Sequence, residues 1–217
     1  MARTREPVPP RECAPDLPAE LDDVSSLSPR DDLVAARIAG LAGDVDASHG
    51  RLAESELVAA SVDRLDLGGA TLADVRVTDV RATELRARDG RWRNVLVAGG
   101  RVGTLDLSRA DLDGVELRGL RIDYLSLAVA SVVDVRLVDC VIGVVDLPEA
   151  RVERVAFDGC RADEVDTRGL RATDLDLRGL EALSFTDPAG LRGATMTELQ
   201  AEQHAAAFAV ALGIRLR

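Results

Sequence analysis

Few residues of this chain have the types and spacing that catalysis or metal binding requires. The 217 residues contain only two histidines, His49 and His204, which are too far apart in the sequence to suggest a metal cluster. No nucleophile elbow, phosphate-binding loop or dinucleotide fingerprint is present. The many carboxylates have no predicted water-excluding pocket around them. We therefore expect no enzymatic activity, no metal and no cofactor.

Charged side chains that recur every twenty residues are the main candidates for a binding surface. The candidate acidic face consists of Asp66, Asp106, Asp146 and Asp166, in a series that also contains Arg86 and Ser126. Two further series are Arg81, Arg101, Arg121, Val141, Arg161 and Asp74, Asn94, Gly114, Asp134, Asp174. Exposed ion pairs contribute little each. These columns are interpreted either as solvated charge or as a surface that contacts a partner.

Apolar side chains replace polar ones at outward positions between Tyr124 and Pro148. These residues are Tyr124, Ala128, Val129, Val133, Val138, Val141, Val144 and Pro148. Exposed apolar patches often mark partner sites, but valine is also a good strand former. The candidate partner patch is Tyr124, Val129, Val141 and Val144. Tyr124 and Val144 should stack on one face, with Val141 close by.

A five-residue period from Leu52 to Ala182 must position all of these side chains. Every fifth residue from Leu52 is apolar except Thr167, and every fifth residue from Ala60 is apolar or small. A helix repeats its apolar face at about 3.6 residues and a strand at 2. An inward pair two residues apart, followed by a turn, explains the period. Fixed-period repetition of this kind is typical of a solenoid, so we predict an all-β solenoid.

The repeat resembles that of the pentapeptide repeat family, whose unit is commonly written A-(D/N)-L-x-x. The best matching unit is Ala110-Asp111-Leu112-Asp113-Gly114, and the resemblance covers about Ala36 to Ala182. It implies a right-handed quadrilateral β-helix with about twenty residues per coil. The first inward position departs from the family's alanine, because small and large residues alternate there with a period of ten.

The inward residues should fill a narrow lumen without voids or overlap. Trp92 is the largest of them, and the small residues Gly90, Ala82 and Ala87 are expected to make room for it. Cys140 and Cys160 are twenty residues apart and should stack as reduced core cysteines. Three cysteines are too few for a disulfide framework.

The two ends of the chain differ from the coil. Prolines from Pro7 to Pro18 preclude regular structure, so we expect a flexible N-terminal tail over residues 1–31. The coil is expected over residues 32–186, with a register slip of one residue within Leu41 to Asp44. Residues 187–217 should form a C-terminal helix and tail.

That helix is expected to start at a capping box spanning Thr195 to Glu198, to run to Leu212 and to end at a left-handed Gly213. It covers the open end of the coil, or it covers that end and also joins two copies as a homodimer. The candidate cap or dimer residues are Leu199, Ala205, Phe208 and Leu212.

Composition narrows the class of partner. A net charge of −11 argues against direct nucleic-acid binding, which needs basic surface. No secretory segment and no long apolar run is present, so we expect no membrane contact and a cytoplasmic location.

Two functions remain open. The first is a non-catalytic protein–protein interaction scaffold that binds an unidentified protein through the apolar patch. The second follows from the resemblance, because some pentapeptide repeat proteins protect DNA gyrase from inhibitors as acidic, rod-like dimers that imitate duplex DNA. A mimic needs a continuous acidic ribbon, whereas a scaffold needs the apolar patch to be exposed.

Overall fold

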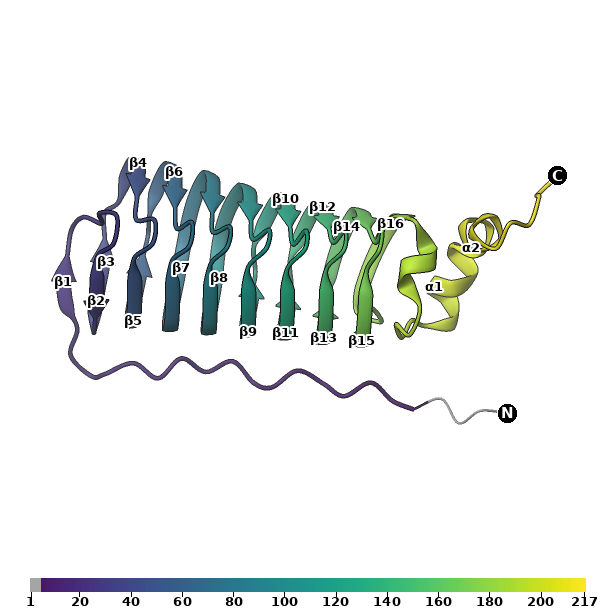
Figure 1. Ribbon diagram of the computed structural model, residues 1–217, viewed down its shortest axis with the longest axis horizontal. Helices are drawn as coiled ribbons and strands as arrows, with labels where there is room; N and C mark the ends of the chain where they lie inside the picture. The colour runs from purple at the N-terminus through teal and green to yellow at the C-terminus, as the bar shows by residue number, and fades with distance from the viewer. Residues whose placement is uncertain (1–4) are drawn as a thin grey trace.

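Parallel pairing between residues about one coil apart builds the whole molecule. The computed structural model describes residues 5–217, in which sixteen strands form one parallel sheet wound into about eight turns. Figure 1 shows the turns stacked in a single row, with the helices at one end and the N-terminal segment along one flank. The predicted all-β solenoid is confirmed.

The strands divide each turn into short extended segments. They are β1 (Asp22–Val24), β2 (Asp32–Val34), β3 (Ala36–Ala39), β4 (Ala42–Asp46), β5 (Arg51–Val58), β6 (Ser61–Asp66), β7 (Thr71–Arg86), β8 (Arg91–Asp106), β9 (Asp111–Arg118), β10 (Arg121–Ser126), β11 (Ser131–Val138), β12 (Val141–Asp146), β13 (Arg151–Asp158), β14 (Cys160–Asp166), β15 (Arg171–Asp176) and β16 (Leu180–Thr186).

The register between turns is twenty residues over most of the coil. Arg91 pairs with Asp111, twenty residues later, whereas Asp32 pairs with Arg51, nineteen residues later. A β-bulge between Gly43 and Asp44 marks where β4 changes from the shorter to the longer register. The slip predicted within Leu41 to Asp44 is therefore confirmed.

Four short sides make up each turn, because four pairs of alternate residues point inward. In one turn these buried pairs are Ala110 and Leu112, Val115 and Leu117, Leu120 and Ile122, and Leu125 and Leu127. We call residues 110–114 side one, 115–119 side two, 120–124 side three and 125–129 side four. The same positions recur at twenty-residue intervals in the other turns.

The lumen is filled as its residue sizes predict. Trp92 is 1% exposed. A Cβ atom added at Gly90 would lie 3.5 Å from the Trp92 indole nitrogen and 2.9 Å from the Ala87 carbonyl oxygen. The indole is thus at an ordinary van der Waals distance, and the close approach at Gly90 is to the backbone. That Gly90 makes room for Trp92 stays a prediction. Cys140 and Cys160 are both buried free cysteines, which confirms that they are reduced core residues.

Three of the four corners use left-handed backbone in most turns. One corner, between sides one and two, contains Asp74, Asn94, Gly114 and Asp134 with φ of 55°, 54°, 71° and 53°. Glycine, asparagine and aspartate adopt this conformation most easily. The corner after side four includes Val129 at φ 60°. A β-branched residue in this region is an outlier that stores strain.

The N-terminal region differs from the expected tail. Residues 5–21 lack helix and strand, as the prolines predict, but they lie against the coil through hydrogen bonds to distant turns. Asp22–Val24 already form β1, which pairs with β3, so the coil starts before residue 32. Proline excludes helix and inner strand, yet it suits an extended segment bound by side chains.

The C-terminal region contains two short helices where one was predicted. A 3₁₀ turn over Pro188–Leu191 precedes α1 (Glu198–Gln203) and α2 (Ala205–Ala211). The predicted capping box was wrong by two residues, since Thr197 is the cap and Gln200 its reciprocal partner. The helix breaks at His204, whose ring packs edge-on against Phe185 at 4.9 Å. Gly213 has φ 78°, the predicted left-handed conformation.

Within residues 5–217, no helix is long and apolar enough to span a membrane.

Replacing Val129 with asparagine should stabilise the fold. Asparagine adopts left-handed backbone more readily than valine, so Val129→Asn is expected to raise the free energy of unfolding by about 1 kcal/mol. Chemical denaturation measures this change. Val141→Asn is the matched control, because the same replacement in extended backbone removes a strand former and should not stabilise. A loss of stability in Val129→Asn would contradict the strain.

Candidate functional site

Side three brings three residues of the predicted patch together. Tyr124 of β10 pairs directly with Val144 of β12, and Val141 lies on the same side one turn beyond Arg121. Tyr124 is 38% exposed and Val141 is 48% exposed, while Val144 is half-buried. The predicted stacking of Tyr124 on Val144 is confirmed. These three residues form what we call the side-three patch.

The other outward apolar residues do not join this patch. Val129 is exposed, but it lies at the corner after side four. Val133 is on side one, and Val138 is on side two, where it is only 8% exposed. The apolar stretch in the sequence therefore winds around the coil, and a smaller surface results than the sequence suggests.

A row of arginines adjoins the side-three patch. Arg81, Arg101 and Arg121 are directly paired on neighbouring turns. Arg101 Nη2 lies 3.3 Å from Asp123 Oδ2, and among residues 5–217 no carboxylate lies within ion-pair distance of Arg81 or Arg121. Like charges placed directly opposite destabilise a sheet. The row is therefore well suited to an external negative group.

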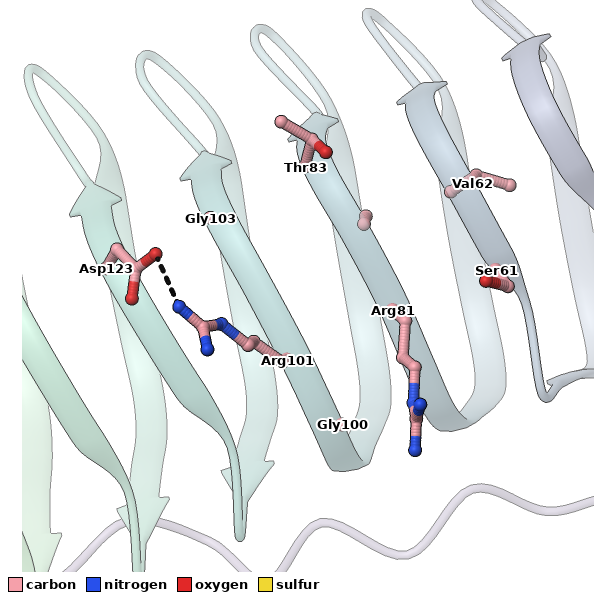
Figure 2. Close-up of a pocket in the computed structure, with 9 residues that line it drawn as sticks. Ser61, Val62, Arg81, Thr83, Gly100, Arg101, Gly103 and Asp123 are labelled. Atoms are coloured by element: carbon pink, nitrogen blue, oxygen red, sulfur yellow. Dashed lines mark hydrogen bonds and ion pairs between the residues drawn. The ribbon is translucent and has the colours of Figure 1, made fainter.

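A shallow hollow of about 680 Å³ lies on this row. Its lining includes Arg81, Thr83, Arg101, Gly103 and Asp123. Figure 2 shows Arg101 turned towards Asp123 while Arg81 points away from both. A Cβ atom added at Gly103 would lie 2.5 Å from the Thr83 carbonyl oxygen, so glycine permits the close approach of the two strands there. Tyrosine and arginine are among the side chains that contribute most of the binding energy at protein interfaces.

The candidate acidic face lies on side four, but its carboxylates are already engaged. Asp66 and Asp166 each accept a hydrogen bond from the backbone N–H two residues later, at 2.8 and 3.0 Å. Asp106 accepts the equivalent bond at 3.0 Å and lies 3.3 Å from Arg88 Nε. Asp146 accepts a hydrogen bond from Ser126 at 3.2 Å.

These contacts decide what the acidic column can do. Carboxylates that accept backbone N–H groups two residues on stabilise turns. Asp166 is also paired with Arg168, which lowers the pKa of its carboxyl group. Arg86 and Ser126 interrupt the column in register. The column is a set of turn-stabilising carboxylates with local counter-charges, and not a continuous free ribbon.

The side-three patch and the acidic column meet at Tyr124. Burial of the phenol and the nearby Asp146 carboxylate raise the pKa of Tyr124 to about 12. The corner between sides three and four is part of β10, without a left-handed residue, so Tyr124 leads directly to Ser126. A carboxylate beside an exposed aromatic ring gives this edge both polar and apolar character.

The C-terminal helices close the coil mainly through polar and aromatic contacts. Gln200 Nε2 donates hydrogen bonds to the carbonyl oxygens of Leu177 and Leu180, both at 2.7 Å. Phe208 packs against the core, whereas Leu199 and Leu212 are 64% and 79% exposed. Ala205 is also exposed. Of the four predicted cap or dimer residues, only Phe208 therefore contributes to the cap.

Among residues 5–217, no group of three or more histidine, cysteine, aspartate or glutamate side chains is arranged to hold an ion.

Comparison with solved structures gives a loose match. One solved structure, of QnrB1, a plasmid-mediated fluoroquinolone resistance protein, shares 12% identity and covers 91% of this chain and 99% of its own, with a TM-score of 0.27. That overlay is too loose to support a functional argument, so the fold assignment rests on the pairing and burial described above. No family model matches the chain, and no curated protein matches it.

Two features of the surface were missed by sequence reasoning. The first is the hollow on the arginine row, whose lining includes Arg81, Arg101 and Gly103. The contacts of residues 5–21 depend on Asn94 and Asp134, which belong to a column that the sequence marked only as polar. A proline-rich segment that also carries Arg11 was the available signal for a bound segment.

The raised pKa of Tyr124 is directly testable, because the chain has a single tyrosine. Phenolate absorbance should titrate near pH 12, above the ordinary value of 10. Since the folded state favours the neutral phenol, this contribution to stability is present below pH 10 and is lost as the pH rises towards 12. Asp146→Asn should lower the pKa, and Asp66→Asn should leave it unchanged. An ordinary wild-type value would refute this electrostatic environment.

Proposed function

We propose that the protein is a non-catalytic scaffold that binds a partner protein through side three. The observation that carries this proposal is the exposed side-three patch of Tyr124, Val141 and Val144, held in register beside a row of arginines. A flat parallel sheet holds these side chains rigidly, so little ordering entropy is lost on binding. A partner surface with apolar residues beside carboxylates would fit it.

The strain at Val129 marks a second candidate contact point, at the corner after side four. Val129 is 55% exposed, so burial does not explain a valine in left-handed backbone. Strained residues persist where the surrounding structure over-determines them and often lie at functional sites. Val129 lies at the far end of side four, so a partner bound to the side-three patch would have to cover side four as well to reach it.

Protection of DNA gyrase by DNA mimicry is the second candidate. The net charge of −11 and the rod-like stack favour it. The engaged state of Asp66, Asp106 and Asp166 disfavours it, because carboxylates used in turns are less available to a DNA-binding groove. The arginine row on side three also opposes a uniformly acidic surface. We therefore place the scaffold first.

The C-terminal end is proposed as a homodimer contact in addition to a cap. Apolar side chains that are more than half exposed gather in this segment. They are Leu183, Leu199, Val210, Leu212, Ile214 and Leu216. A second copy that covers the same residues would remove them from water, and burial of this kind drives association.

Charge placed on the side-three patch should abolish partner binding. We expect immobilised wild-type protein to retain a partner from lysate of its own cells, and Val141→Asp to reduce that retention at least tenfold, because a charge would be buried in an apolar contact. Ser131→Asp is the matched control, since Ser131 is also exposed but lies on side one. Equal retention by both variants would contradict the scaffold proposal.

A supercoiling assay separates the two candidates. Purified gyrase is assayed with and without a fluoroquinolone at rising protein concentration. The scaffold proposal predicts no effect. Inhibition or drug protection that disappears when Asp106 and Asp146 are both changed to arginine would place the mimic first.

The dimer contact predicts a defined change in mass. Light scattering after gel filtration should give twice the chain mass for the wild type and the monomer mass for Leu212→Asp. Val34→Asp is the control, because Val34 is 50% exposed at the opposite end of the coil. A monomeric wild type would overturn this contact.

A further inference from the structure

The N-terminal segment is bound along the length of the coil. Residues 5–21, which we call the strap, run back beside the turns from the C-terminal end to β1 (Figure 1). Their contacts fall at the corner between sides one and two and on the neighbouring parts of both sides. We call this surface the strap corner and define it by Asp74, Asn94, Asp113 and Asp134.

Asn94 forms hydrogen bonds with the backbone of the strap. The backbone N–H of Ala14 donates to Asn94 Oδ1 at 3.0 Å, and Asn94 Nδ2 donates to the Ala14 carbonyl oxygen at 2.9 Å. One carboxamide thus satisfies both polar groups of one peptide residue. This contact requires an extended backbone, and it does not depend on which side chain that residue carries.

Asp134 and Asp113 bind the side chain of Arg11. Arg11 donates from Nε to Asp134 Oδ2 at 2.7 Å and from its backbone N–H to Asp134 Oδ1 at 3.1 Å. Its Nη2 contacts Asp113. The Asp134 side chain is only 2% exposed, so this carboxylate is sheltered from solvent screening. A single guanidinium therefore bridges two turns of the coil.

The spacing of these contacts matches an extended, proline-rich chain. Asn94 and Asp134 are two turns apart, or about 9.6 Å at 4.8 Å per turn. Ala14 and Arg11 are three residues apart, or about 9.3 Å in polyproline II geometry. The same three residues in a helix would span only about 4.5 Å. The prolines of the strap favour polyproline II, the conformation whose spacing matches the strap corner.

The strap corner is built independently of the strap. Arg154 holds Asp134 through two hydrogen bonds of 2.7 and 3.0 Å, and Asn94 also donates to Asp74. The left-handed backbone at these positions belongs to the repeating turn. The side chains of Asp134 and Asn94 are therefore already oriented when the strap is absent.

The strap itself is held by few contacts. Besides Arg11 and Ala14, the polar contacts are a 3.3 Å hydrogen bond from Asp16 N–H to Asp74 and a 3.0 Å ion pair between Glu6 and Arg178. No residue of the strap belongs to the buried apolar core, and none of residues 5–21 makes a backbone–backbone hydrogen bond to the coil. Such a segment detaches with a small local free energy.

We propose that the strap corner is a peptide-binding site for an extended, proline-rich segment of a partner protein that carries one arginine, and that the strap occupies this site in competition with it. Charge complementarity selects the arginine, and the Asn94 carboxamide selects extended backbone. The site lies on a different part of the coil from the side-three patch and does not depend on the proposed scaffold function.

The test is a binding titration with full-length proteins and a fluorescein-labelled peptide of residues 5–21 with Cys13→Ser. Four proteins are compared: wild type, Arg11→Ala, Arg11→Ala with Asn94→Gly, and Arg11→Ala with Asp174→Gly. Glycine keeps the left-handed corner without strain and removes only the side chain. Asp174 occupies the same column with φ 52° and has no polar contact with residues 5–21, so it is the matched control.

Arg11→Ala should bind the peptide at least tenfold more tightly than the wild type, whose own strap fills the site. Asn94→Gly should abolish this gain, and Asp174→Gly should preserve it. A peptide with its own Arg11→Ala should not bind. Failure of Arg11→Ala to bind the peptide, or equal affinity for all four proteins, would overturn the proposal.

Hydrogen exchange on the intact chain gives a second readout that needs no added ligand. The amides of Arg11 and Ala14 should exchange more slowly than in the free peptide, and Asn94→Gly should remove the protection at Ala14. Amides of the strap that exchange at the free-peptide rate in the wild type would show that the segment is not docked, and would overturn the proposal.

Discussion

Hydrogen bonding between successive turns is the constraint on which the rest of the structure depends. Each backbone segment pairs with the segment one turn away, so every turn must return to the same position after twenty residues. An extra or missing residue would move inward side chains to the outside. The chain accommodates the change from a nineteen-residue to a twenty-residue register between Gly43 and Asp44, in a strand near the N-terminal end whose residues are largely exposed. The strict five-residue period in the sequence follows from this constraint.

The corners explain why the charged residues are arranged as they are. Left-handed backbone favours aspartate, asparagine and glycine, so acidic side chains accumulate at corners for conformational reasons. Carboxylates such as Asp66 and Asp166 also accept the N–H groups of the turns that follow them. Arginines one turn away then pair with acids, as Arg109 does with Asp89 at 2.6 Å. Much of the net negative charge is thus a consequence of building corners.

Sequence reasoning succeeded where a residue's position in the repeat decides its environment. The lumen around Trp92, the buried Cys140 and Cys160, the bulge near Gly43 and the stacking of Tyr124 on Val144 all follow from counting residues. Counting residues does not by itself show on which side of the coil each outward valine lies, because that requires knowing where each turn starts. Val129, for example, was included with Tyr124 in the candidate patch but lies at the corner after side four.

The misjudged segments lie outside the repeat. Prolines excluded helix and inner strand from residues 5–21, but composition alone cannot reveal contacts with Asn94 and Asp134 from distant turns. The capping box was displaced because Thr195 and Thr197 both precede a possible partner three residues later. Tertiary contacts decided between them, since Gln200 also donates to Leu177 and Leu180 at the last turn. Pairing of His204 with Phe185 then accompanies the helix break.

The distribution of covered and uncovered surface links the fold to its proposed binding roles. A solenoid without loops offers only its sides, corners and ends to partners. The corner between sides one and two is covered by the chain's own strap, and the last turn is covered by α1 through Gln200. Side three is covered by neither, although it carries Tyr124, Val141 and three stacked arginines. The chain thus covers the hydrogen-bonding groups of the strap corner and the strand edge of the last turn. It leaves side three exposed, where aromatic, aliphatic and cationic side chains suit a stable protein contact.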